Sequence, residues 1–284
     1  MVCKTMNMTK AAQALHITQP AVSQHIKALE QEFGVPLFLH QGKKMRLTQA
    51  GEMLCQSAQT MRHDAAMLKQ QMALAGRERR VLNFGATLTV GEYAMPPVLI
   101  RYLAQHPDTR ISLHVADTTQ LLQRLDSGAI DFAIVEGTFP QSIYECLLFR
   151  KERFLAVCSG QSPLKKQSYH IQELLSQRLL VREEGSGSRR ILQTYLEGEN
   201  LSIEDFANRV EAGNIAVLKT LAQAGCGITF LYETAVKQEL MEGTLQAVPL
   251  ENFNIQHDFS FLWRKGSQFA QQYQEIYQAL KEQA

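Results

Sequence analysis

Residues 9–38 constrain this chain more than any other segment, because they combine two short amphipathic helices with a tight turn. Thr9 is the expected N-cap of the first helix, and His16 and Ile17 interrupt its pattern. Thr18 is a second N-cap, and Pro20 falls in the first turn of the next helix, where a missing N–H is tolerated. The apolar positions of the first helix are Ala11, Ala12, Ala14 and Leu15.

The second helix carries one apolar face and one polar face. Its apolar positions recur at spacings of four and three and end near Phe33, with Gly34 as the expected stop. These positions are Val22, Ile26 and Leu29. Two such helices joined by a tight turn predict a helix-turn-helix, whose second helix can enter the major groove of DNA.

The polar face of this second helix consists of Gln19, Ser23, Gln24 and Lys27. Glutamine can bond adenine through two hydrogen bonds, serine can bond bases or phosphate, and lysine pairs with phosphate or guanine. An ordinary solvated helix face is the alternative interpretation of these residues taken alone.

A basic hairpin is expected after the second helix. The segment HQGKKMRLT places Gly42 at the tip, with Lys43 and Lys44 beside it and Arg46 on the return. Residues 1–50 carry six basic and two acidic side chains, a net charge of +4, whereas the remainder carries −3. A basic head on a mildly acidic body indicates a polyanionic partner for the head.

The string AAQALHITQPAVSQHIKALEQEFGVPLF, followed by GKKMRLTQAG, closely resembles the signature of LysR-type transcriptional regulators. The resemblance implies a sequence-specific DNA-binding regulator controlled by a small effector. It implies that DNA is lined by Thr18, Gln19, Pro20, Ser23, Gln24 and Lys27, with support from the wing cations. The sequence departs from the family at Gln24 and His40, where arginine is common. Only VCKTMNM represents the family's first helix. Either the true start lies upstream, or the head lacks that helix, in which case part of its core is expected to be uncovered.

Residues 48–76 predict one long helix, since they contain no proline and only one internal glycine before Gly76. A heptad seam over this helix favours self-association, although a helix packed on its own chain is the alternative. The seam comprises Leu54, Ala58, Met61, Ala65, Leu68 and Met72, and continues to Ala75. A homodimer would suit a near-palindromic site in double-stranded DNA, and the family resemblance extends this to a homotetramer.

From residue 81 the pattern changes to alternating strands and helices, which predicts parallel sheets. Strand-like links near 154–160 and 255–262 divide this body into two α/β lobes. The resemblance implies a periplasmic-binding-protein-like effector domain. The expected domains are a winged helix-turn-helix head (1–50), a linker and dimerisation helix (51–76) and an effector domain (81–284), with lobe I at 81–158 and 256–284 and lobe II at 162–254.

Ligands of parallel sheets bind at the carboxyl ends of strands, near helix N-termini. Candidate effector-binding residues at such positions are Thr87, Thr89, Thr118, Glu136, Ser186, Ser188, Arg189 and Asn214. The loop GSGSR (185–189) combines hydroxyls, backbone N–H groups and a cation, which favours an anionic effector. Helix capping is the alternative role for each lone Thr or Ser.

Other classes of function find little support in the sequence. No cofactor fingerprint and no cluster with metal-ligand spacing is present. The lack of a long apolar run or an export signal predicts a cytoplasmic protein without membrane contact, and argues against the rival solute-binding protein of a transporter. An enzyme built on Cys226 is the second rival, but no local motif supports catalysis.

Overall fold

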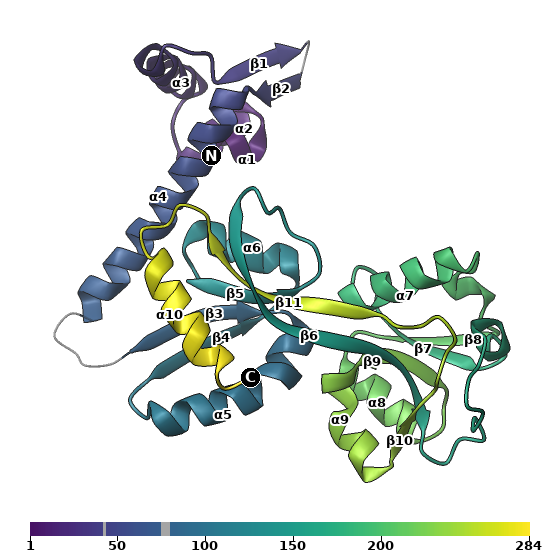
Figure 1. Cartoon of the computed structure of the whole chain (residues 1–284). Helices are drawn as coiled ribbons and strands as arrows, with labels where there is room; N and C mark the ends of the chain where they lie inside the picture. Colours follow the sequence, from purple (N-terminus) through teal and green to yellow (C-terminus); the bar gives the residue numbers. More distant parts are fainter. Residues whose placement is uncertain (42–43, 75–79) are drawn as a thin grey trace.

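The computed structural model describes residues 1–41, 44–74 and 80–284, which form a small head, a long helix and a two-lobed body (Figure 1). The head stands at one end of the long helix, away from the body. Its elements are α1 (Val2–Thr5), α2 (Met8–Leu15), α3 (Gln19–Phe33), β1 (Phe38–Gln41) and β2 (Lys44–Leu47). The predicted fold class, a helical head with a two-stranded wing on an α/β body, is confirmed.

The two helices of the helix-turn-helix begin at capping side chains. Asn7 Oδ1 accepts a hydrogen bond from the N–H of Lys10 at 2.9 Å, so α2 starts earlier than expected and the predicted cap at Thr9 is wrong. Asparagine is at least as good an N-cap as threonine, and the earlier start adds helical hydrogen bonds. Thr18 Oγ1 accepts from the N–H of Ala21 at 3.4 Å and starts α3, as predicted.

The core of the head is small but closed on the side where an uncovered surface was expected. The side chain of Val2 in α1 is buried and joins a cluster of α2 and α3 residues. The buried members of this cluster are Val2, Ala11, Ala12 and Val22. Leu15 and Phe33, outside the cluster, remain exposed. The short α1 therefore covers the junction of α2 and α3, although it leaves some apolar surface of the head in contact with solvent.

The long helix α4 (Gln49–Leu74) connects the head to the body. Its first turn is capped by Thr48, whose Oγ1 accepts from the N–H of Gly51 at 2.9 Å and donates to the carbonyl of Pro36 at 2.7 Å. These two bonds tie the start of α4 to the chain that enters the wing. The predicted seam residue Ala75 lies outside the described residues.

The body is built on a nine-stranded sheet that passes through both lobes, with β4-β3-β5-β11-β6-β9-β7-β8 in order and β10 paired to β6. Lobe I contains β3 (Val81–Ala86), β4 (Arg110–Val115), β5 (Phe132–Glu136), the π-helical turn η1 (Val90–Ala94), α5 (Met95–Gln105), α6 (Thr118–Ser127) and α10 (Ala270–Lys281). Lobe II contains η2 (Ile171–Leu174), β7 (Arg178–Arg182), α7 (Gly187–Gly198), η3 (Ile203–Asp205), β8 (Asn208–Ala212), α8 (Ile215–Gln223), β9 (Ile228–Tyr232), α9 (Glu233–Glu242) and β10 (Leu245–Ala247).

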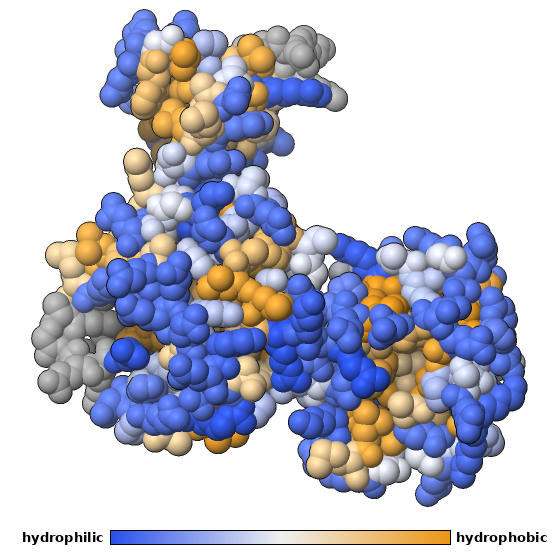
Figure 2. Space-filling view, in the orientation of Figure 1, coloured by the Kyte–Doolittle hydropathy of each residue, from blue (hydrophilic) through white to orange (hydrophobic). Residues whose placement is uncertain are grey.

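Two long strands, β6 (Tyr144–Ser159) and β11 (Gln256–Arg264), join the lobes. They pair antiparallel from Arg264↔Tyr144 to Gln256↔Arg153, with an irregularity between Phe259 and Ser260. Each lobe is thus a parallel sheet extended by a shared antiparallel ribbon. Figure 2 shows the result as two rounded masses joined by a narrower waist.

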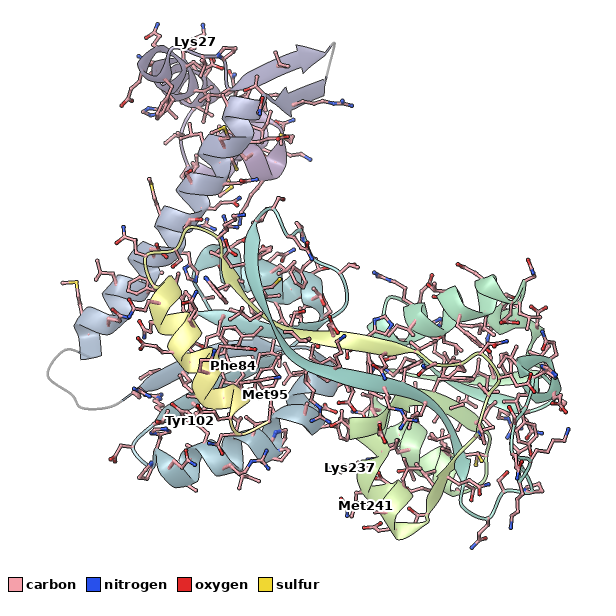
Figure 3. All side chains as sticks on the ribbon, viewed as in Figure 1. Lys27, Phe84, Met95, Tyr102, Lys237 and Met241 are labelled. Atoms are coloured by element: carbon pink, nitrogen blue, oxygen red, sulfur yellow. The ribbon has the colours of Figure 1, made fainter. Side chains whose placement is uncertain are left out.

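The core of lobe I is aromatic and holds the sheet against α5 and α10. The rings of Phe84 and Phe132 stack at 4.9 Å, and those of Phe132 and Phe261 at 4.5 Å, so one stack spans β3, β5 and β11. Met95 and Tyr102 of α5 are fully buried on the same lobe (Figure 3). Burial of such large apolar side chains stabilises each lobe as a rigid unit. None of the described helices is both long enough and apolar enough to cross a bilayer.

Candidate functional site

The predicted recognition helix α3 presents a polar surface opposite its buried residue Val22. The side chains of Gln19, Gln24 and Lys27 are exposed, and Ser23 is half-buried. Figure 3 shows Lys27 on the part of the head farthest from the body. Two further residues expected at the DNA, Thr18 and Pro20, are exposed in and beside the first turn of α3.

The predicted wing exists as the hairpin of β1 and β2, paired antiparallel from Phe38↔Leu47 to Gln41↔Lys44. Arg46 is exposed on β2. Lys44 begins β2, whereas Gly42 and Lys43 lie outside the described residues. A wing beside a recognition helix places cations where they can meet the DNA backbone.

Helix α4 has two faces with different surroundings. One face packs on lobe I and buries Thr60, His63 and Met67. The predicted seam lies on the other side of the helix, where Leu54 is half-buried and the rest are exposed, namely Ala58, Met61, Ala65, Leu68 and Met72. Met61, Leu68 and Met72 are 70%, 52% and 69% exposed, values that are high for large apolar side chains.

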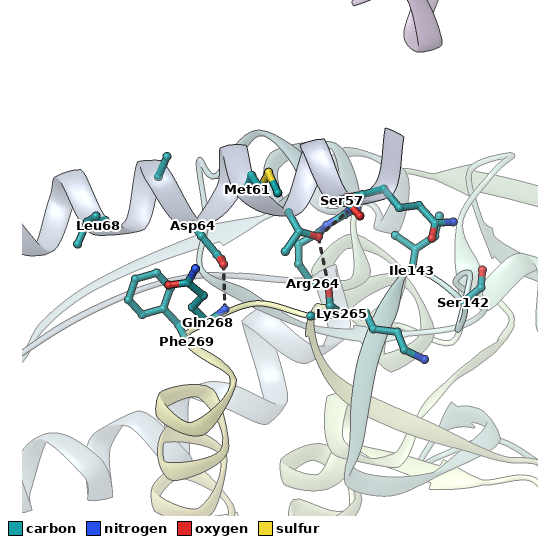
Figure 4. A pocket seen from close by; sticks show the side chains of 14 residues that line it. Ser57, Met61, Asp64, Leu68, Ser142, Ile143, Arg264, Lys265, Gln268 and Phe269 are labelled. Carbon is teal, nitrogen blue, oxygen red and sulfur yellow. Dashed lines mark hydrogen bonds between the residues drawn. The ribbon is translucent and has the colours of Figure 1, made fainter. Parts of the chain in front are cut away.

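A buried polar network fastens α4 to lobe I. Arg264, the last residue of β11, is 1% exposed; its guanidinium donates to Asp126 Oδ1 at 2.6 Å and to Thr60 Oγ1 at 3.3 Å. Asp64 of α4 accepts from Ser267 Oγ at 2.7 Å and from the N–H of Gln268 at 2.9 Å (Figure 4). We name this network the α4 anchor; it consists of Thr60, Asp64, Asp126, Arg264 and Ser267.

A small groove opens beside the α4 anchor. It has a volume of about 730 Å³ and lies between α4 and the loop after β11. Met61 and Leu68 of α4 line it together with Phe269 (Figure 4).

A larger cavity of about 1620 Å³ lies between the two lobes. Five of the predicted effector-binding residues line it: Thr87, Thr118, Glu136, Ser186 and Ser188. They come from the ends of strands β3 and β5 and from the N-termini of α6 and α7, as the sheet topology predicts. The cavity therefore collects groups from both lobes.

Glu136 is the centre of a hydrogen-bond network in this cavity. Its backbone N–H donates to Thr87 Oγ1 at 3.2 Å, and its carbonyl accepts from Thr118 Oγ1 at 3.4 Å. Thr89 Oγ1 donates to Glu136 Oε1 at 3.5 Å. Burial raises the pKa of the Glu136 carboxyl to about 7, while the Thr89 hydroxyl and the nearby Arg182 charge act in the opposite direction.

Three predicted effector-binding residues do not line the cavity. Thr89 is 1% exposed, and its hydroxyl donates to Glu136 Oε1 without lining the cavity. The guanidinium of Arg189 bonds Glu211 and the carbonyl of Arg182, so its charge is directed away from the cavity. Asn214 Oδ1 accepts from two N–H groups of α8, which is the capping role that the sequence left open.

Sequence reasoning missed two prominent residues of the cavity, Arg182 and Tyr232. Each is the last residue of a parallel strand, β7 or β9, as Glu136 is of β5. This shared position was the signal that could have found them. Arg182 donates from Nε and Nη2 to the two carboxylate oxygens of Glu183, both at 2.7 Å. Among the residues that the structure describes, no cluster of His, Cys, Asp or Glu could hold a metal ion.

The head and the body each match a known protein family. Residues 1–52 match the family described as bacterial regulatory helix-turn-helix protein, lysR family, and residues 75–284 match the LysR substrate binding domain. The HTH-type transcriptional activator CmpR of Synechocystis sp. is 28% identical over 272 residues, which cover 95% of this chain and 88% of that protein.

Solved structures have the same fold over the whole chain. Full-length OxyR from Pseudomonas aeruginosa has a TM-score of 0.62 at 22% identity, covering 99% of this chain and 90% of that one. Full-length LysG from Corynebacterium glutamicum with bound effector Arg also has a TM-score of 0.62, at 20% identity, covering 99% and 95%. The chain therefore belongs to the LysR family of bacterial transcriptional regulators, with a DNA-binding helix-turn-helix head and an effector-binding body.

Proposed function

We propose that α3 reads bases in the major groove while the wing contacts the adjacent backbone. The exposed polar face of α3, opposite buried Val22, is the observation that carries this proposal. Gln19 and Gln24 supply side-chain amides for base edges, and Lys27 and Arg46 supply cations for phosphate or guanine. The remaining proposed DNA-binding residues are Thr18, Pro20, Ser23, Lys43 and Lys44.

We propose that residues 1–50 bind DNA, residues 51–76 mediate dimerisation and residues 81–284 bind the effector. The exposed apolar seam of α4 supports a homodimer, because an exposed stripe of this kind is unusual on a monomer. Two heads related by a two-fold axis favour a near-palindromic site, and a homotetramer is a further step of the same assembly. We also propose that the protein works in the cytoplasm, where its DNA target is located.

We propose that the cavity between the lobes is the effector site. LysG carries its bound effector Arg within the same overall fold, which supports a small molecule as ligand here. An anionic group of the effector would bind at the start of α7, where Ser186 caps the helix and the N–H groups of Gly187 and Ser188 have no intrahelical partner.

Closure of the lobes on an effector would reach the DNA through α4. Helix α6 lines the cavity with Thr118 at its start, and carries Asp126 of the α4 anchor near its end. Strand β11 likewise lines the cavity with Gln256 and ends at Arg264 of the anchor. We propose that both elements shift α4 and thereby the spacing of the heads. Such a shift requires an effector that prefers one arrangement of the lobes.

We propose no catalytic role. Cys226, the nucleophile of the enzyme alternative, lies in a turn where its N–H donates to the carbonyl of Leu221 and its carbonyl accepts from Arg178. The solute-binding alternative leaves the recognition helix without a role.

Replacing Lys27 with alanine tests the DNA-binding proposal. Loss of one phosphate contact is expected to weaken binding to all DNA sequences and to lower the slope of log K against log salt by about one unit per half-site. Gel shifts on genomic fragments at several salt concentrations would measure both quantities.

Lys237→Ala is the matched control, because Lys237 is an equally exposed lysine on α9 in lobe II (Figure 3). It is expected to leave the affinity and its salt slope unchanged. Equal effects of the two substitutions would contradict the assignment of α3 as the DNA-reading helix.

A further inference from the structure

Glu136 brings an unsatisfied carboxylate oxygen to the cavity between the lobes. The residue is 8% exposed, lines the cavity and receives one side-chain hydrogen bond, from Thr89 to Oε1. Its other oxygen, Oε2, is buried and has no hydrogen-bond partner among the described residues. Buried carboxylates are normally bonded at both oxygens, so this one points to a donor supplied by a ligand.

Two arginines near Glu136 are paired with carboxylates of the chain itself. Arg182, the arginine whose charge acts on Glu136, gives two hydrogen bonds to Glu183. Arg189 is bound to Glu211. Tyr232 also lines the cavity with a buried hydroxyl that has no partner among the described residues. A ligand with hydrogen-bond donors would therefore supply Glu136 Oε2 with the partner that it lacks among the described residues.

The charge of the cavity wall favours a ligand with a cationic group. Two arginines line the wall, Arg182 and Arg190. More carboxylates line it, namely Asp117, Glu136, Glu183, Glu184 and Asp258. A wall with this excess of negative charge attracts an ammonium group and repels a purely anionic ligand.

A set of hydrogen-bond donors that can bind a carboxylate lies directly beside Glu136. A Cβ built on Gly187, the first residue of α7, would lie 3.6 Å from Glu136 Oε1. The free N–H groups at this helix start favour negative charge. The Glu136 carboxylate, which favours a cation, and the N-terminus of α7, which favours an anion, are thus adjacent across the two lobes. A ligand that satisfies both needs an ammonium group and a carboxylate close together, as on the shared α-carbon of an α-amino acid.

We propose that the effector is an α-amino acid, whose ammonium group donates to Glu136 Oε2 and whose carboxylate binds the start of α7 at Gly187 and Ser188. This inference rests on the proposed role of the cavity as the effector site. It gives the bound molecule a bridging role, because Glu136 belongs to lobe I and α7 to lobe II.

The twenty standard α-amino acids are the probes, tested one at a time on the full-length protein by thermal shift and then by titration calorimetry. At least one is expected to bind. Its deamino acid and its decarboxylated amine are each expected to bind at least tenfold more weakly, since each lacks one of the two charges. Acetate, succinate, citrate and inorganic phosphate form the comparison panel of anions without an amine.

Glu136→Gln is the decisive variant, because it keeps the size of the side chain and the acceptor for Thr89 but removes the charge. It is expected to weaken binding of the amino acid at least tenfold. Glu197→Gln is the matched control, since Glu197 is an exposed carboxylate on α7 that does not line the cavity, and it should leave the affinity within about twofold. Unchanged Tm values without ligand show that both variants fold.

The pH dependence supplies an independent readout. An ammonium group favours ionised Glu136, whose pKa is about 7 in the free protein, so affinity should rise from pH 6 to pH 8. A bound anion without an amine would favour protonated Glu136, and its affinity should fall over this range. Arg182 and Tyr232 face Glu136 from lobe II, and burial raises the pKa of Tyr232 far above this range. His257 also lines the cavity, but burial lowers its pKa and so limits its charge. Glu136→Gln should remove the rise.

The outcomes separate this inference from the proposed function. The amino-acid assignment is overturned if no standard amino acid binds, or if an anion binds and Glu136→Gln leaves its affinity unchanged. In the second case the cavity remains an effector site of another chemistry. If neither panel binds or alters the DNA footprint, the proposed effector site fails as well.

Discussion

Replacing Arg264 with methionine is expected to lower the free energy of unfolding of the body by about 3 kcal/mol, with a fall in Tm of roughly 6–12 °C. Arg264 is buried, and its guanidinium bonds Asp126 and two groups of α4, the carbonyl of Gln56 and Thr60 Oγ1. Methionine retains much of the volume but leaves Asp126 without its cation and these acceptors without a donor. The cost of breaking a buried pair exceeds that of a surface pair for this reason.

Lys265→Met is the matched control, because Lys265 follows Arg264 in the chain but forms an ion pair that is exposed to solvent. Lys265 Nζ lies 3.9 Å from Glu145, and both side chains are about half exposed. Such a pair contributes little, so Tm should change by no more than roughly 2 °C. Thermal unfolding followed by circular dichroism measures both variants. Similar Tm values for the two would show that the α4 anchor does not stabilise the junction of helix and body.

The strands and helices of the body were largely predictable because their apolar runs are local features of the sequence. The run FAIVE is buried at every position of β5, and the alternation of such runs with amphipathic helices indicates a parallel sheet. The length of β6 was not predictable in the same way. Its exposed residues lie in the part of the strand that pairs with β11, and β11 follows about a hundred residues later in the chain.

The cavity was predictable in position but only partly in composition. The rule that ligands bind at strand ends identified Thr87, Thr118 and Glu136, since strand ends can be read from the sequence. It could not tell that Arg189 turns to Glu211, because that carboxylate lies on the neighbouring strand β8. It also could not tell that Arg182 is neutralised by Glu183. The sequence-based expectation of an anionic effector rested on the hydroxyls, backbone N–H groups and single cation of residues 185–189, and it did not include the carboxylates of the cavity wall.

The heptad spacing of α4 identified one apolar face, but α4 has two. The predicted seam is the exposed one, whereas Met67 packs into the core of lobe I from the other side. The two interpretations of this helix, pairing with a second copy and packing on its own chain, were therefore compatible. Periodicity alone could not separate them, because side chains from both faces recur at spacings of three and four.

The exposed face of α4 leads to the prediction with the largest expected effect on function. The double substitution Met61→Glu and Leu68→Glu is expected to convert the proposed homodimer to a monomer. Both side chains are more than half exposed and line the groove beside the α4 anchor, so the folded chain tolerates glutamate there. At a dimer seam, however, two paired α4 helices would bring four carboxylates into an apolar contact. The free energy needed to desolvate these charges opposes dimerisation.

Loss of the dimer should lower affinity for a two-half-site DNA by 10²- to 10⁴-fold, because each head then binds without the effective concentration provided by its partner. Size-exclusion chromatography with light scattering measures the mass, and gel shifts measure the affinity. Met241→Glu is the matched control, since Met241 is 79% exposed on α9 in lobe II, far from α4 (Figure 3). It should leave mass and affinity unchanged. A double variant that stays dimeric would move the interface away from this face of α4, whereas a monomer with full affinity would mean that one head alone carries recognition.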